Sequence, residues 1–254
     1  MKVLVCIKRV PAVAGRITLT GDERAIDVKY LGFAIGPHEE CAVEEAVKLV
    51  EANGGESVVL TLGPAESVEQ LRDAMAVGVS RAIHLVTDGE EWDPQATAGA
   101  IVDAIRADEA ASGPFDLVLV GNEAGDTGDY QVAVRVGYAL GRPVVTGLKG
   151  LAVTGGIARC EQEAGGARDV YEVPLPAVLG ILEGLNLPRL PSVPGRIRAK
   201  SKPVAASQPT RPAAQLEMVT LAVPPVTSSQ AVVLGTGPEA APAVVELLGS
   251  LGVL

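Results

Sequence analysis

The sequence predicts an α/β fold of the doubly wound type, built on a mostly parallel sheet. Short apolar segments alternate with amphipathic segments over residues 2–140, which is the pattern of strands and crossover helices. The apolar residues are mainly Val, Leu, Ala and Ile, as in strands that are buried on both faces. The chain has 254 residues, more than the roughly 150 of a typical domain, which allows one large domain or one domain with an appendage.

The first part of the chain contains the clearest elements. Residues 2–7 are apolar and β-branched and predict a buried strand, and residues 16–31 alternate around a Gly-Asp pair and predict a hairpin or meander. Residues 37–53 predict a helix, because apolar side chains recur at helical spacing opposite an acidic face. A proline suits its first position, and two glycines follow its end. Residues 57–62 predict the next strand, which Gly-Pro closes.

The alternation continues to residue 140. We expect helices over residues 68–77, 94–111 and 131–140, and strands over residues 82–86 and 116–121. Because crossovers between parallel strands are right-handed, these elements fit a doubly wound sheet.

The pattern changes after residue 141. Residues 150–172 alternate in short runs separated by two Gly-Gly pairs, which predicts antiparallel strands added to the sheet. Residues 176–182 predict one more apolar strand. Residues 186–194 are rich in proline, and residues 196–202 are basic.

The end of the chain reads as an appendage. Residues 203–215 are rich in Pro, Ala and Ser and predict an extended arm. A short strand over residues 232–234 and a helix over residues 238–248 follow. The Val and Leu stripe of that helix must dock on its own domain or on another chain, and the reach of the arm favours another chain. We therefore divide the chain into a domain over residues 1–202 and a docking appendage over residues 203–254.

Charge and composition exclude some classes of function. The formal net charge is −10 and aromatic residues make up 3% of the chain. An acidic chain gains little from binding a phosphate backbone, and few aromatic side chains are available to stack on bases. We therefore expect no nucleic-acid partner.

The cysteines and the apolar runs bear on location. Cys6, Cys41 and Cys160 are odd in number and far apart, so they predict neither disulfides nor a metal site, and a reducing, cytoplasmic compartment fits them. The apolar run over residues 3–7 is too short for a signal peptide. The uncharged run over residues 218–238 is too polar and too rich in proline to insert into a membrane.

Candidate catalytic residues are scarce. Of the two histidines, His84 lies within an apolar strand, where a structural role is usual, and His38 stands alone. The sequence contains no nucleophile-elbow setting, no histidine cluster for zinc and no calcium-loop spacing. We expect a protein without catalytic residues or a metal of its own.

A nucleotide site is better supported. The segment over residues 121–131 follows a strand and precedes a helix, which is where ligands bind in open α/β sheets. Its glycines permit close approach, and free N–H groups at the helix start can bind phosphate. The alternative is a plain connection in which Asp129 caps the helix. At the start of the helix over residues 37–53, Glu39 and Glu40 would repel phosphate, so that end suits a base or a ribose.

Several ordered motifs resemble the beta subunit of electron transfer flavoprotein. Residues 37–46 read PHEECAVEEA, and residues 71–82 read LRDAMAVGVSRA. The motifs LPAV, NLPR and RAK follow at residues 175–178, 186–189 and 198–200, at the spacing of the family. The likeness covers about residues 1–202, and the arm with its helix is also similar to the family.

The resemblance implies a fold, partners and cofactors. It implies an adenine-nucleotide alpha-hydrolase-like sheet in a heterodimer whose alpha subunit holds most of the FAD, and it implies structural AMP in this subunit. It further implies transient partners in fatty acid oxidation, namely acyl-CoA dehydrogenases and a membrane quinone oxidoreductase. In electron-bifurcating relatives a second FAD occupies the AMP site.

The resemblance also implies site residues. The expected nucleotide-binding residues lie at strand ends, at a helix start and in the loop before the next helix: Cys6, Gly36, Pro37, His38, Glu39, Leu62, Gly121, Asn122, Glu123, Ala124, Gly125, Asp126, Thr127, Gly128, Asp129, Tyr130, Gln131 and Val132. Val13 is expected near the flavin of the partner. The expected dehydrogenase-docking loop contains Leu190, Pro191, Ser192, Val193, Pro194, Gly195, Arg196 and Ile197.

Some positions depart from the pattern that the resemblance implies. Gly36 stands where the family has Asn, and Val132 and Ala133 stand where it has Thr and Gly. The acidic run of the phosphate loop is reduced to residues 126–129, and residues 165–169 lack the expected signature. A rival reading is a stand-alone adenine-nucleotide sensor of the universal-stress type, which would need neither the segment over residues 186–200 nor the arm.

Overall fold

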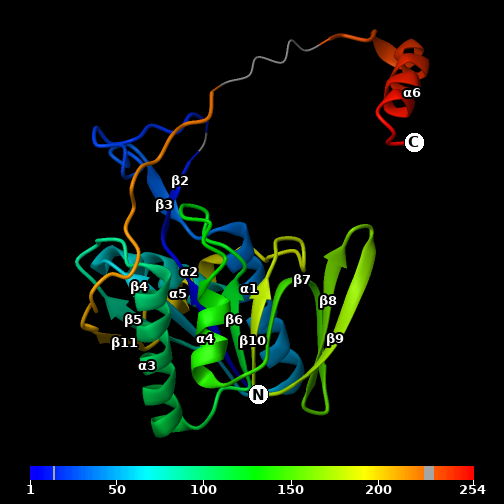
Figure 1. Ribbon diagram of the computed structural model, residues 1–254. Coiled ribbons are helices and arrows are strands. Elements are labelled where there is room, and N and C mark those ends of the chain that lie inside the picture. Colours follow the sequence, from blue (N-terminus) through cyan, green and yellow to red (C-terminus); the bar gives the residue numbers. More distant parts are fainter. Residues whose placement is uncertain (14, 226–231) are drawn as a thin grey trace.

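A computed structural model describes residues 1–13, 15–225 and 232–254 (Figure 1). Its strands are β1 (Lys2–Ile7), β2 (Val10–Ala12), β3 (Gly32–Ala34), β4 (Glu56–Gly63), β5 (Arg81–Val86), β6 (Leu117–Gly121), β7 (Val144–Thr154), β8 (Ile157–Ala164), β9 (Ala167–Pro174), β10 (Ala177–Ile181) and β11 (Val204–Ser207). Its helices are α1 (Pro37–Asn53), α2 (Val68–Val77), α3 (Pro94–Ser112), α4 (Val132–Leu140), α5 (Val193–Ala199) and α6 (Ala241–Ser250), with 3₁₀ turns η1 (Ala65–Ser67) and η2 (Gly237–Ala240).

The larger sheet is built outward from β1, first on one side and then on the other. Its strand order is β11-β5-β4-β1-β6-β10-β7-β8-β9, and the strands from β11 to β7 are parallel to their neighbours. From β1 the chain moves outward to β4 and β5, and α3 then returns it to β6 on the other side of β1. This is the doubly wound topology that the alternation predicts, and it places a topological switch point between β1 and β6.

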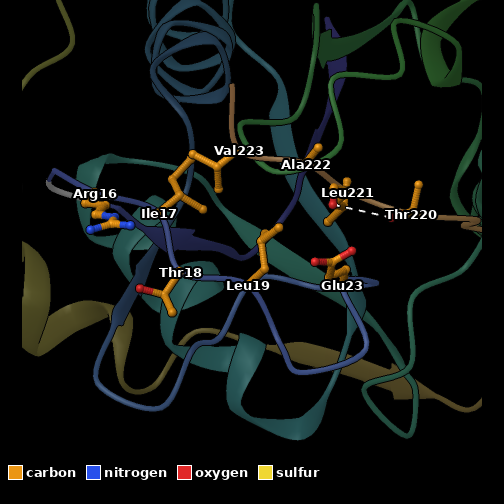
Figure 2. A pocket seen from close by; sticks show the side chains of 9 residues that line it. All are labelled: Arg16, Ile17, Thr18, Leu19, Glu23, Thr220, Leu221, Ala222 and Val223. Carbon is orange, nitrogen blue, oxygen red and sulfur yellow. Dashed lines mark hydrogen bonds between the residues drawn. The ribbon is translucent and has the colours of Figure 1, made fainter. Parts of the chain in front are cut away.

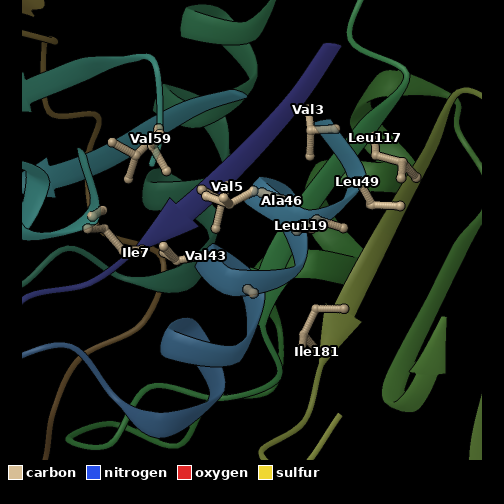
Figure 3. Packing of buried hydrophobic residues seen from close by; sticks show 14 of the residues in the cluster. Val3, Val5, Ile7, Val43, Ala46, Leu49, Val59, Leu117, Leu119 and Ile181 are labelled. Carbon is tan, nitrogen blue, oxygen red and sulfur yellow. The ribbon is translucent and has the colours of Figure 1, made fainter. Parts of the chain in front are cut away.

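Two helical layers cover the sheet, and β1 contributes to both cores. Val3, Val5 and Ile7 pack with α1 and α2 on one face (Figure 3), whereas Leu4 and Cys6 pack with α3 and α4 on the other. Because side chains alternate across a strand, a strand buried on both faces must be apolar throughout. Each fully buried Val or Leu of this kind stabilises the fold by about 1.5–3 kcal/mol.

The antiparallel strands form as the alternation predicts. β7, β8 and β9 are antiparallel to one another. Gly155 and Gly156 both have positive φ, 59° and 80°, and Gly165 and Gly166 have φ of 55° and 85°. Two adjacent residues with positive φ form the two-residue hairpin turn that matches strand twist, so the glycine pairs terminate the strands for a steric reason.

Three predictions about the elements need correction, and a fourth is confirmed in reduced form. Between residues 16 and 31 an isolated antiparallel bridge joins Leu19 to Ile26 across the Gly-Asp turn, which is the predicted hairpin at its shortest, and the regular pair β2–β3 lies outside it. The arm does not leave the domain at residue 203, because β11 pairs with β5. The predicted docking loop contains the helix α5. Residues 232–234, which the structure describes, form no strand, and the last helix starts as the 3₁₀ turn η2.

The arm is held at two places after β11. Backbone N–H groups of Gln215 and Leu216 donate to Asp93 Oδ2 at 2.7 and 3.4 Å, and the N–H of Leu221 donates to the carbonyl of Glu23 at 2.7 Å. Figure 2 shows the second place, where residues 220–223 line a cavity of about 530 Å³ together with residues 16–19 and Glu23. Beyond it, α6 lies away from the α/β body in Figure 1 and has no buried residue. Docking of α6 on a partner stays a prediction.

The amino edge of the sheet is held by a charged cluster. Asp108 of α3 accepts hydrogen bonds from Lys2 Nζ at 2.6 Å and from both terminal nitrogens of Arg81 at 2.7 and 3.0 Å. Arg81 also pairs with Glu56. Burial works to raise the pKa of Asp108, but the hydrogen bonds from Arg81 and Lys2 outweigh it and lower the pKa from 3.8 to about 2.

This cluster predicts part of the acid sensitivity of the fold. Because the folded-state pKa of Asp108 lies below the unfolded value, its stabilisation is present above about pH 4 and is lost as the pH falls toward 2. We expect Asp108→Asn to lower the free energy of unfolding at pH 7 by about 1–3 kcal/mol and to flatten its dependence on pH between 4 and 2. Urea unfolding followed by circular dichroism measures both. The exposed Asp103→Asn on the same helix is the control, and an unchanged slope in Asp108→Asn would contradict the assignment.

Candidate functional site

The predicted nucleotide site lies at the switch point. Cys6 is in register with Leu60 of β4 and with Val120 of β6, so the ends of three parallel strands meet there. The start of α1 and the loop before α4 rise from the same edge. The structure therefore brings together the three segments that the sequence nominated: the end of β1, residues 36–39 and residues 121–131.

Glu39 is the most buried carboxylate of this region. Its side chain lies between Gly36, at the start of α1, and Gly121, at the end of β6. A Cβ at Gly36 would lie 2.5 Å from Glu39 Oε2, and a Cβ at Gly121 would lie 2.9 Å from both Cγ and Cδ. The two glycines thus form a slot that the carboxyl fills.

The slot leaves the carboxyl poorly solvated. Glu39 is 3% exposed, and its Oε2 finds no hydrogen-bond partner among the described residues. Burial raises the pKa of Glu39 from 4.5 to about 7. The backbone N–H groups of residues 36 and 39 and the charge of Lys8 oppose this rise, while Asp126 adds to it.

His38 ties the start of α1 to its surroundings. Its Nδ1 accepts a hydrogen bond from the backbone N–H of Glu183 at 2.8 Å, so the proton of the neutral ring lies on Nε2. Nε2 lies 3.3 Å from Oε1 of Glu123, to which it donates. His38 therefore joins the end of β10 to the loop over residues 121–131 and fixes where α1 begins.

The loop over residues 121–131 is fastened at its first residues. Asn122 donates its N–H to the carbonyl of Ile181 at 2.9 Å, and its side-chain oxygen accepts from the N–H of Gly147 at 2.7 Å. Gly128 and Tyr130 have positive φ, 59° and 56°. These contacts hold the loop on the end of β10 and on β7.

The start of α4 corrects the alternative in which Asp129 caps the helix. The N-cap is Gln131, and within the described residues no side chain caps the first turn. The carbonyl oxygen of the Gln131 side chain instead accepts from Arg135. The first N–H groups of α4 are thus open to an anion, as a phosphate site requires.

Lys8 supplies a cation that the sequence analysis did not assign to the site. Its Nζ lies 2.8 Å from Asp126 Oδ2 and 2.8 Å from Glu91 Oε1. Burial works to lower the pKa of Lys8, but the two carboxylates outweigh it and the pKa is raised. The Lys8 ammonium therefore stays protonated, and the carboxylates of Asp126 and Glu91 balance its positive charge. The position of Lys8 directly after the first strand could have pointed to it. Its pairing with Asp126 could not be read from the sequence, because the two residues are 118 positions apart.

Two further expected residues lie at the margin. Cys6 is 5% exposed and burial raises the pKa of its thiol to about 12, so its side chain is a core group and only its backbone borders the edge. Leu62 is half-buried near the end of β4. Val13 follows β2 and is 37% exposed, and its position near a partner's flavin stays a prediction.

The expected docking segment presents an apolar surface. Leu190, Val193 and Ile197 are 91%, 73% and 65% exposed. The segment is nevertheless anchored, because Arg189 Nε lies 2.9 Å from Oε2 of the buried Glu44 and its terminal nitrogens bind Glu51. Where the sequence predicted a loop, Ser192 starts α5 by accepting the N–H of Gly195 at 3.1 Å.

Comparisons with known proteins agree on one family. The sequence model described as "Electron transfer flavoprotein domain" matches residues 26–212. The chain is 34% identical over 230 residues to "Electron transfer flavoprotein subunit beta" of Syntrophomonas wolfei, covering 90% of this chain and 88% of that protein. It is 35% identical over 174 residues to the protein of the same name from Bacillus subtilis, covering 68% and 66%. It is also 31% identical to the mitochondrial protein of that name from Oryza sativa, covering 82% of each.

The glycine slot yields a stability prediction. We expect Gly121→Ala to destabilise the fold by about 1–3 kcal/mol, because the added Cβ meets inner atoms of the buried Glu39 side chain. Gly125→Ala, whose Cβ would meet only Val10 at 3.9 Å, should change stability by less than about 0.5 kcal/mol. Thermal unfolding compares the two, and equal stabilities would show that the slot does not constrain Glu39.

Proposed function

The chain belongs to the electron transfer flavoprotein family, as a beta subunit, and from this membership we propose that it is half of a cytoplasmic heterodimer that carries electrons. In this proposal the heterodimer receives electrons from acyl-CoA-type dehydrogenases and delivers them to a membrane quinone oxidoreductase. No helix within residues 1–13, 15–225 and 232–254 has the length and apolar character needed to cross a membrane.

The observation that carries the proposal is the extent of the likeness. Similarity to a beta subunit covers 90% of the chain, and the elements that a nucleotide sensor would not need are present. These elements are the anchored segment before α5, the arm and α6. The apolar side chains of α6, such as Val245 at 58% exposure, lie on a helix with no buried residue, which suits a surface completed by a partner.

We propose that the FAD is held mainly by the alpha subunit. FAD supplies the one- and two-electron chemistry when it is bound. In this proposal, the role of this chain is to shield the flavin from water. The β2–β3 pair and the arm project together from the sheet edge (Figure 1), and Val13 directly follows β2. A protein surface that covers one face of a flavin limits the access of water and so helps to set its potential.

We propose that AMP binds in this subunit at the switch point. The residues fit a nucleoside monophosphate in two respects: the orphaned Oε2 of Glu39 suits a hydrogen-bond donor such as a ribose hydroxyl or a base amine, and the open N–H groups of α4 suit a phosphate. Gly36, His38 and the loop over residues 121–131 would surround it. AMP supplies no redox chemistry there.

Co-expression with the alpha subunit tests the proposal. The chain purified alone should be colourless, and the complex should migrate as a 1:1 heterodimer with one FAD. Mass spectrometry of the released nucleotides should identify AMP as well. A yellow isolated chain would instead indicate a second FAD at the switch point, and a stable homodimer that binds ATP and ignores the alpha subunit would indicate the nucleotide sensor.

The exposed start of α5 yields a prediction on docking. We expect Val193→Asp to raise the KM for an acyl-CoA dehydrogenase by about tenfold, because a charge replaces an exposed apolar contact at the centre of the proposed interface. The KM is obtained from the rate at which reduced dehydrogenase bleaches the flavin absorbance. Val170→Asp, on β9 at the opposite edge of the sheet, is the control, and FAD content verifies that both variants assemble. Equal KM values would place the docking surface elsewhere.

A further inference from the structure

The carboxyl of Glu39 points to a link between nucleotide and proton. We propose that the switch-point site binds a nucleoside monophosphate with Glu39 in its protonated, neutral form, so that occupation of the site is coupled to uptake of one proton from the solvent. This inference rests on the proposed AMP site and assigns to it a pH dependence.

The first argument is steric. Gly36 and Gly121 enclose the carboxyl from two elements, and a Cβ on either would fall within 3 Å of it. The side chain cannot swing away without giving up this slot, and at 3% exposure it is not reached by bulk water. The groups around this slot therefore determine the ionisation of the carboxyl.

The second argument concerns the groups that face the carboxyl. From the residue after β1 it faces Lys8, whose charge is already shared between Asp126 and Glu91. From the loop before α4 it faces Asp126, whose charge works against ionisation. On α1 itself, the N–H groups of residues 36 and 39 favour the ionised form.

The remaining charged groups around the helix start are engaged elsewhere. His38 is held between the N–H of Glu183 and Glu123. Glu40 faces Glu183. Neither the imidazole nor these carboxylates compensate a negative charge on Glu39. Burial prevails in this balance and raises the pKa of Glu39 to about 7, so the free protein divides between the two forms near neutrality.

A bound phosphate shifts this balance in one direction. It adds negative charge at the start of α4, where the loop that carries Asp126 ends, and the negative charge of Asp126 on this loop already works against ionisation of Glu39. A protonated carboxyl donates one hydrogen bond and can accept others, so it can pair with an acceptor or with a donor of a ribose or a base.

Calorimetry of AMP binding to the nucleotide-free heterodimer tests the proposal. At pH 8, titrations in Tris and in Hepes, which differ in ionisation enthalpy, should show uptake of about one proton per site. Affinity should fall about tenfold between pH 6 and pH 8, because the protonated fraction of a group with this pKa falls by that factor. Glu39→Gln mimics the neutral carboxyl and should abolish the uptake and bind AMP more tightly than wild type at pH 8.

The outcomes separate the two proposals. Glu40→Gln, which removes the neighbouring exposed carboxyl, should retain the uptake. Binding with the same heat in both buffers overturns the proton link and leaves the AMP site standing. Uptake that persists in Glu39→Gln belongs to the phosphate of AMP and also overturns it. Absence of any binding heat in the wild type overturns the AMP site and the link together, and FAD content verifies that each variant has assembled.

Discussion

The reversal of strand order between β1 and β6 is the constraint on which the rest of the structure depends. Because the chain leaves β1 on one side and β6 on the other, the crossover helices diverge and leave the strand ends uncovered. Cys6 and Val120, which are in register, bring these ends to the same level. The start of α1 and the loop before α4 therefore face each other, and His38 and Glu123 join them. The end of β1, residues 36–39 and the loop over residues 121–131 meet at this gap.

The gap is closed by small groups and one acid rather than by cations. Gly36 and Gly121 admit the carboxyl of Glu39, and Lys8 is neutralised by Asp126 and Glu91. A phosphate at this edge would meet the backbone N–H groups at the start of α4, where Arg135 donates to the side chain of the N-cap residue Gln131. Binding of this kind depends on the exact course of the main chain, which explains why the first residues of the loop are fastened to β10 and β7 through Asn122. At this site Glu39 is then the group whose charge changes with pH near neutrality.

Elements defined by local pattern could be predicted, whereas those created by distant contacts could not. The bounds of α1 and α2 follow from helical periodicity, and α1 also from the proline at its start and the glycine after its end. By contrast, β11 exists because it pairs with β5, more than a hundred residues earlier, and its Val-Ala-Ala-Ser sequence has no strand signal of its own. In the site, the loop was nominated by its place after a strand. The pair formed by Lys8 and Asp126 and the slot of Glu39 required the fold, since their partners are far apart in sequence. The helix α5 was missed although Ser192 and Pro194 are an N-cap and an early helical proline, because the resemblance implied a docking loop there.

The two exposed apolar surfaces differ in how they are held, and this difference suits two kinds of partner. The surface with Val193 and Ile197 is rigid, because α5 packs on α2 and Arg189 clamps the preceding segment to the buried Glu44. A rigid surface loses little conformational freedom on docking, so a small contact can form and dissociate rapidly. In contrast, α6 has no buried residue, and the described part of the arm before it is held by a few hydrogen bonds, so fixing α6 on a partner requires a large interface that stays formed. In the proposed heterodimer, α6 therefore serves the permanent contact with the alpha subunit, and α5 serves the transient contact with a dehydrogenase.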